Sequence, residues 1–194
     1  NRALKIKPDY DTAYYNLGIM LYEQERLAEA INCFKNAIKY NPNCFPAYNS
    51  LGDAFQKQWK LDEAVISYSQ AIELKPDYAD AFYNRGLALK RQCKFDAAIE
   101  SFRQAINLNP DWFEFHYHLG NILKEKGDYN DAIESYTKAI KYNPNSAEVY
   151  LNIGVSFIKL ERLNEAIVSC SQAIKIKPDY AEAFYNLGIV FCEQ

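Results

Sequence analysis

The residue types that most often carry catalysis or bind metals are few in this chain and poorly spaced for that chemistry. The 194 residues include two histidines, His116 and His118, and five cysteines. The histidines are two residues apart in a segment with helical periodicity, so their side chains point in different directions and do not share a metal ion. No C-x-x-C pair, glycine-rich phosphate loop or nucleophile motif occurs. We therefore expect no enzymatic activity, no metal and no cofactor.

Asparagine and tyrosine side chains recur at regular spacing and suit a different chemistry, the recognition of a polypeptide. Asn16, Asn84 and Asn152 are 68 residues apart (84 − 16 and 152 − 84), and Tyr15 and Tyr83 precede the first two. The amide of asparagine both donates and accepts hydrogen bonds, so it can pair with the peptide unit of an extended chain. Tyrosine adds rigid amphipathic contact area. Such a column would recognise the backbone of a ligand rather than its sequence.

This spacing belongs to a repeat of 34 residues that runs through the whole chain. The segment KPDYDTAYYNLG at 7–18 recurs as KPDYADAFYNRG at 75–86 and as KPDYAEAFYNLG at 177–188, and weaker copies begin at 41, 109 and 143. With Asp11 as repeat position 1, glycine falls at position 8, alanine at positions 20 and 27, and proline at position 32. A fixed period of this length indicates stacked supersecondary units rather than one globular core.

Each repeat predicts two amphipathic helices and no strand. The apolar stripe of the first helix (helix A) in the third repeat consists of Ala81, Phe82, Gly86 and Leu89. A second stripe, at 95–106, predicts helix B. Small residues at positions 8, 20 and 27 allow the helices to approach closely, and large residues fill the space around these contacts. We expect an added β-carbon at position 8 to push helices A and B apart.

The helix ends carry two further predictions. Aspartates that follow the position-32 proline, such as Asp77 and Asp111, are expected to cap the next helix A. The turn between helices A and B falls at position 15, where glycine is the easiest residue, and only Gly127 is a glycine. We expect backbone strain or a shifted turn at the other four positions, which are Glu25, Trp59, Cys93 and Glu161.

The combined pattern resembles the tetratricopeptide repeat (TPR), with departures at Arg85, His116 and Cys170 that affect local packing. The resemblance implies an all-α fold, a right-handed superhelical solenoid of antiparallel helix pairs built from 34-residue TPR units. It also implies that helices A line a concave groove that binds a segment of a partner. We expect a single TPR array over 1–194, divided as 1–10 (the end of a preceding repeat), 11–44, 45–78, 79–112, 113–146, 147–180 and 181–194 (the first helix of a further repeat). Both termini fall inside predicted helices, so we expect a piece of a longer array.

The resemblance places a candidate peptide-binding site on the helix A positions that packing does not use. The predicted contact residues are Tyr15, Asn16, Asn49, Asp53, Tyr83, Asn84, Arg91, Tyr117, His118, Asn121, Asn152, Tyr185 and Asn186. The asparagine column is similar to the asparagine ladder in the repeat arm of O-GlcNAc transferase. An alternative is that these asparagines bond to the neighbouring repeat. Basic residues near the ends of helices A, such as Lys57 and Arg91, either compensate the helix dipole or attract an acidic segment.

Composition narrows the class of partner. The net charge of −3 argues against nonspecific binding of nucleic acid, and there is neither a signal peptide nor an apolar run long enough to span a membrane. An odd number of cysteines without C-x-x-C spacing is typical of reduced thiols. We therefore expect a cytoplasmic or nuclear protein whose partner is a protein or peptide.

Three functions remain open. The first is a non-catalytic scaffold that binds an extended or helical segment of a partner in the concave groove. The second is a substrate-recruiting arm of a larger enzyme, such as a glycosyltransferase. The third is end-to-end self-association through apolar residues of the last helix, such as Phe184, Leu187 and Phe191.

Overall fold

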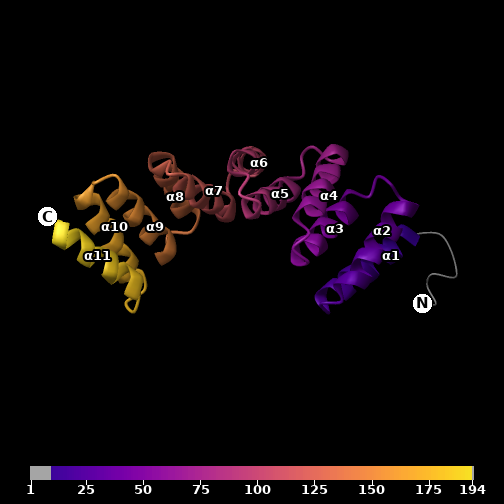
Figure 1. The fold of residues 1–194 in the computed structure, drawn as a ribbon, viewed down its shortest axis with the longest axis horizontal. Helices are drawn as coiled ribbons and strands as arrows, with labels where there is room; N and C mark the ends of the chain where they lie inside the picture. Colours follow the sequence, from indigo (N-terminus) through magenta and orange to yellow (C-terminus); the bar gives the residue numbers. More distant parts are fainter. Residues whose placement is uncertain (1–9, 194) are drawn as a thin grey trace. The chain divides into compact units, whose positions relative to one another are not determined.

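The computed structural model describes residues 10–193, which form eleven α-helices joined by short turns (Figure 1). The helices are α1 (Tyr10–Glu23), α2 (Leu27–Tyr40), α3 (Phe45–Lys57), α4 (Leu61–Leu74), α5 (Ala79–Arg91), α6 (Phe95–Leu108), α7 (Phe113–Lys126), α8 (Tyr129–Tyr142), α9 (Ala147–Lys159), α10 (Leu163–Ile176) and α11 (Ala181–Glu193). No strand occurs in this range, so the predicted all-α fold is confirmed. From α5 onward each odd helix begins 34 residues after the previous odd helix. The predicted end of a preceding repeat lies, apart from Tyr10, outside the described residues.

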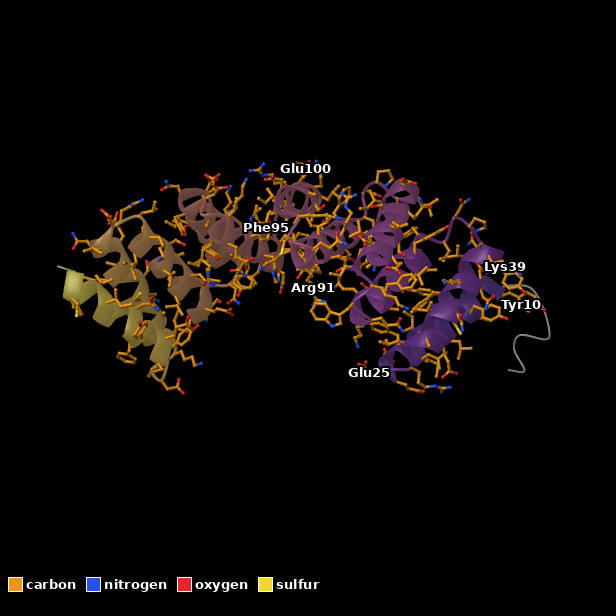
Figure 2. The ribbon with its side chains drawn as sticks, viewed as in Figure 1. Tyr10, Glu25, Lys39, Arg91, Phe95 and Glu100 are labelled. Carbon is orange, nitrogen blue, oxygen red and sulfur yellow. The ribbon has the colours of Figure 1, made fainter. Side chains whose placement is uncertain are left out.

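Consecutive helices pack as antiparallel pairs. The most extensive contacts join each odd helix to the even helix that follows it. Figure 2 shows Tyr10 and Lys39 at one end of the α1–α2 pair and Glu25 at the other, as an antiparallel pair requires. At the first of these ends the rings of Tyr10 and Tyr40 stack with their centroids 5.2 Å apart.

The helices fall into two compact units, with the division between Leu108 and Asn109. Unit 1 contains α1–α6 and unit 2 contains α7–α11. Within unit 1, α3 contacts both α1 and α5, and within unit 2, α9 contacts both α7 and α11. No pair of even helices makes contacts of this extent inside either unit over residues 10–193, so the odd helices lie closer together. We call the surface formed by the odd helices of a unit its A face.

Glycine at position 8 allows the side chain at position 24 to lie directly against helix A. A β-carbon added to Gly18 would lie 2.5 Å from the ring of Phe34, and one added to Gly52 would lie 2.6 Å from the ring of Tyr68. At Gly154 the obstacle would be a sulfur atom, because a cysteine occupies position 24 in that repeat. These distances are too short for any real contact, so the close approach predicted at position 8 is confirmed.

The turns between helices A and B carry the predicted strain. The non-glycine residues with positive φ, all between 58° and 60°, are Glu25, Trp59, Cys93 and Glu161. Gly127 has a φ of 92°. The turns close in the same way, as in the 2.9 Å hydrogen bond from the N–H of Arg26 to the carbonyl of Leu21. The hydrogen bonding is therefore that of a glycine-terminated helix, but four turns carry the steric cost of a β-carbon.

The prediction that aspartates cap the odd helices is wrong for α5 and α7. The N-cap residues of these helices are Tyr78 and Trp112, and neither helix has a side-chain cap hydrogen bond. Asp77 instead pairs with Lys75 over 3.2 Å. The ring of Tyr78 packs edge-on against Phe45 with their centroids 5.1 Å apart. Packing of this ring therefore sets the start of α5.

Candidate functional site

A hydrogen-bond network joins three helices at the A face of unit 1. Asp53 on α3 accepts from the Tyr68 hydroxyl on α4 at 2.8 Å and from Nδ2 of Asn84 on α5 at 3.2 Å. It also accepts from Nδ2 of Asn49, one turn earlier on α3, at 3.3 Å. Nδ2 of Asn84 bonds in addition to Oδ1 of Asn49 at 3.3 Å. Asn84 therefore ties the third repeat to the second.

Every donor to the Asp53 carboxylate is electrically neutral. No lysine or arginine of residues 10–193 forms an ion pair with it. Burial raises the pKa of Asp53 to about 6, assisted by the charge of Asp80 and opposed by the hydrogen bond from Tyr68. At neutral pH the A face of unit 1 therefore holds a partly desolvated carboxylate without a counter-ion.

Unit 2 repeats this network with a neutral residue at its centre. Asn121 on α7 occupies the repeat position of Asp53 and accepts from the Tyr136 hydroxyl on α8 at 2.7 Å. It also accepts from Nδ2 of Asn152 on α9 at 3.4 Å. Nζ of Lys124 on α7 donates to Oδ1 of Asn152 at 2.6 Å. The buried amide of Asn152 is thus bonded through both its nitrogen and its oxygen to the preceding repeat.

Three of the four tyrosines at position 5 pack against the ring at position 24 of their own repeat. The ring centroids lie 5.9–6.4 Å apart in the tilted pairs Tyr15–Phe34, Tyr83–Phe102 and Tyr117–Tyr136. These three tyrosines are half-buried. Tyr117 also donates its hydroxyl to Glu148 on α9, and burial raises the pKa of Tyr117 to about 12. These rings are held in place while part of each remains accessible.

The other predicted contact residues of helices A differ in their surroundings. Asn16 is exposed, and His118 lies edge-on to Tyr117 with a centroid distance of 5.2 Å. On α11, Tyr185 is 69% exposed, and Nδ2 of Asn186 donates to the backbone carbonyl of Glu182 on the same helix. The polar network seen at Asn84 and Asn152 does not extend to Asn186.

Basic residues near the C-terminal ends of α3 and α5 contact the turn of the preceding repeat. Nζ of Lys57 lies 2.6 Å from a carboxylate oxygen of Glu25. The guanidinium of Arg91 lies 5.2 Å from the ring centroid of Trp59. Both partners are residues with positive φ, so the strained turn positions contribute contacts between repeats. Neither interpretation of the basic residues included this role.

Sequence reasoning missed Tyr68 and Tyr136, whose hydroxyls orient the two networks. Both occupy position 24, where we expected large residues only to fill the space around the small positions. A signal was available, because tyrosine occurs at position 24 only in the two repeats with a polar residue at position 9, Asp53 and Asn121. A buried phenol requires a hydrogen-bond acceptor, and position 9 supplies it.

The histidine and cysteine side chains form no reactive constellation in the described part of the chain. His116 is buried, with Nε2 2.7 Å from the backbone oxygen of Pro110 and its ring stacked on Tyr142. All five cysteines are free thiols. Over residues 10–193, no group of histidine, cysteine and acidic side chains could hold a metal ion. Nor is any helix of this range long and apolar enough to cross a membrane.

Comparison with protein families supports the repeat pattern along most of the sequence. A model described as TPR repeat matches residues 18–58, 60–92, 120–160 and 156–194. Two models described as tetratricopeptide repeat match residues 79–111 and 101–134. No curated protein matches the chain.

Several solved structures have the same fold. A crystal structure of MamA protein is 25% identical over 90% of this chain and 95% of that chain, with a TM-score of 0.83. YrrB, described as a TPR protein with an unusual peptide-binding site, is 22% identical over 95% of both chains, with a TM-score of 0.83. PilF of Pseudomonas aeruginosa is 20% identical over 95% of this chain and 85% of that chain, with a TM-score of 0.78. These matches confirm the predicted solenoid of antiparallel helix pairs.

Proposed function

Because this chain belongs to the tetratricopeptide repeat family, we propose that it is a non-catalytic scaffold that binds an extended or helical segment of a partner protein on its A faces. The odd helices of a unit lie closer together than the even helices, which supports the A face as the inner wall against which a segment would bind. The peptide-binding site in the description of YrrB supports this use of the fold.

The observation that carries the proposal is the set of half-buried tyrosines beside fixed polar networks. In unit 1, Tyr15 and Tyr83 pack against core rings, and Tyr83 directly precedes Asn84, which bonds to Asp53. In unit 2, Tyr117 is held both by Tyr136 and by Glu148. Side chains that are ordered before a ligand arrives lose little conformational entropy on binding, and tyrosine is a frequent source of binding energy.

The asparagines of the column take a supporting role in this proposal. Asn84 and Asn152 bond to the preceding repeat, which was the alternative interpretation of the column. They fix the spacing of neighbouring odd helices, and the tyrosines make the main ligand contacts. Asn84 is only half-buried, and its amide has more donor and acceptor sites than the network uses. It can therefore still bond to the backbone of a bound segment.

The test is an array of random peptides of about 12 residues, long enough to cross the odd helices of one unit. The variant Tyr15→Ala/Tyr83→Ala removes two A-face rings, and the matched control Ile66→Ala removes a 63% exposed apolar side chain from α4. We expect the double variant to lose peptide affinity by about tenfold or more and the control to bind like wild type. Thermal unfolding checks that all three proteins are folded. Absence of binding to wild type, or equal binding by all three proteins, would contradict the proposal.

Self-association and enzyme recruitment stay predictions. Phe184 and Phe191 on α11 are 50% and 58% exposed, and a β-carbon at Gly188 would meet no atom within 4 Å among the described residues. In the other repeats an even helix covers the equivalent face, so we expect two copies to associate through α11. Recruitment of substrates to a larger enzyme would use the same A faces. A cytoplasmic or nuclear location also stays a prediction.

A further inference from the structure

We propose that the Asp53 site of unit 1 binds a lysine or arginine side chain of the bound segment, which gives this unit a preference for cationic ligands. The inference rests on the proposed function, because it names the ligand chemistry at one point of an A face. It assigns Asp53 a role that backbone recognition by asparagines does not require.

The hydrogen bonds of the Asp53 carboxylate leave room for a ligand. Asp53 accepts from Tyr68, Asn49 and Asn84, and all three donors are neutral. A carboxylate has about four acceptor sites, so one remains for a ligand. Asp53 is partly exposed as a residue, which leaves a path from solvent to that site. A partly desolvated carboxylate gains strongly from a hydrogen-bonded cation.

The electrostatic field around Asp53 is the second feature that suits a cationic ligand. Asp80 on α5 adds negative charge. Burial, and after it the charge of Asp53, raises the pKa of Tyr22 on α1 and of Tyr68 on α4. The charges of Lys57 and Arg91 oppose these two shifts in pKa, but neither side chain pairs with the Asp53 carboxylate. Lys57 pairs with Glu25 and lies over the ring of Tyr22, and Arg91 lies over Trp59. The surroundings therefore combine negative charge with aromatic rings, which favours a cation.

At the equivalent site of unit 2 the chain supplies its own cation. There Lys124, at repeat position 12, donates to Oδ1 of Asn152. The residue at position 12 of the equivalent repeat in unit 1 is Gln56, which is neutral. In unit 1 the equivalents of Asn152 and Asn121 are Asn84 and Asp53. A ligand ammonium or guanidinium placed like Nζ of Lys124 would contact Oδ1 of Asn84 beside the Asp53 carboxylate.

Two variants test this assignment without removing an A-face ring. Asp53→Asn removes the charge and reproduces the residue that unit 2 carries at this position, Asn121. Gln56→Lys supplies an internal ammonium and reproduces Lys124. The probes are the peptides that bind wild type on the random array. Each is also made with its lysines replaced by norleucine or its arginines by citrulline, so that charge is lost and length is kept.

We expect the array peptides that bind wild type to be enriched in lysine or arginine. Replacing the peptide lysine or arginine that contacts the Asp53 site by its neutral analogue should weaken binding to wild type by about tenfold or more. The same replacement should change the affinity of either variant little. If wild type binds charged and neutral peptides equally while the tyrosine variant still loses binding, the inference falls and the proposed function stands. If no peptide binds wild type, both fall.

Discussion

At the scale of single residues, Asp53 and Asn121 show how one substitution changes an otherwise shared network. Both side chains accept one hydrogen bond from the tyrosine hydroxyl at position 24 and another from an asparagine amide of the next repeat. Only Asp53 can ionise, and its pKa in the folded protein is about 6, against about 4 in an unfolded chain. Between these values the folded state binds a proton that the unfolded state does not. The Asp53 contribution to stability therefore rises as pH falls from about 6 to 4 and is lost as pH rises through about 6.

The substitution Asp53→Asn should remove this dependence. At pH 7 we expect the variant to be more stable than wild type by about 2 kcal/mol, because a carboxylate without a counter-ion is replaced by a neutral amide. Asn49 can turn its amide to present oxygen to the new Nδ2 group. This turn gives up the bond from Nδ2 of Asn84 to Asn49, while Asn84 keeps its bond to Oδ1 of residue 53. Urea unfolding between pH 4 and pH 8 measures the difference, which should shrink toward pH 4. A difference that stays constant over this range would contradict the electrostatic account.

The glycines at position 8 give a matched pair of substitutions. Gly52→Ala places a methyl group 2.6 Å from the ring of Tyr68, and we expect a loss of stability of about 1–3 kcal/mol. Gly188→Ala meets no neighbour within 4 Å among the described residues, so helix propensity alone should add about 0.5–1 kcal/mol. Chemical denaturation of both variants makes the comparison. Effects of the same sign would show that packing at position 8 is not what selects glycine.

At the scale of helices, most of the structure could be predicted from the spacing of small and large residues. The period predicted the helix pairs, and the scarcity of glycine at position 15 predicted the strained turns. The prediction of the caps was wrong because the ring of Tyr78 packs against Phe45, at the other end of the same repeat, and this contact outweighs the local capping signal of Asp77. The role of Asn84 could not be decided from the sequence, because a ligand contact and a bond to the neighbouring repeat both require an amide on the same face of the helix.

The turns predict a second pair of opposite effects. Cys93 is exposed and has a φ of 59°, so Cys93→Gly should relieve strain and raise stability by about 1 kcal/mol. Gly127 has a φ of 92°, so Gly127→Ala should lower stability by about the same amount. Thermal unfolding of the two variants provides the measurement. The account of the turns would be wrong if Cys93→Gly were destabilising.

At the scale of the whole molecule, the exposed side of α11 predicts association. The position of Phe191 corresponds to the large apolar position 11 of the repeat, and 58% of its surface is exposed. We expect the 194-residue chain to form dimers through this helix, because two copies can bury the same apolar face against each other. Light scattering should detect dimers of wild type, and Phe191→Glu should give monomers. An unchanged mass in the variant would exclude α11 as the contact.

The central claim is that the A faces hold a bound segment. Backbone amide shifts of the isotope-labelled chain, recorded by NMR during titration with an array-selected peptide, test this claim most directly. The account predicts that the largest shifts lie in odd helices, around Tyr15 and Tyr83 in unit 1 or around Tyr117 in unit 2. Shifts concentrated in the even helices, α2, α4, α6, α8 and α10, would place the ligand on another surface and contradict the account.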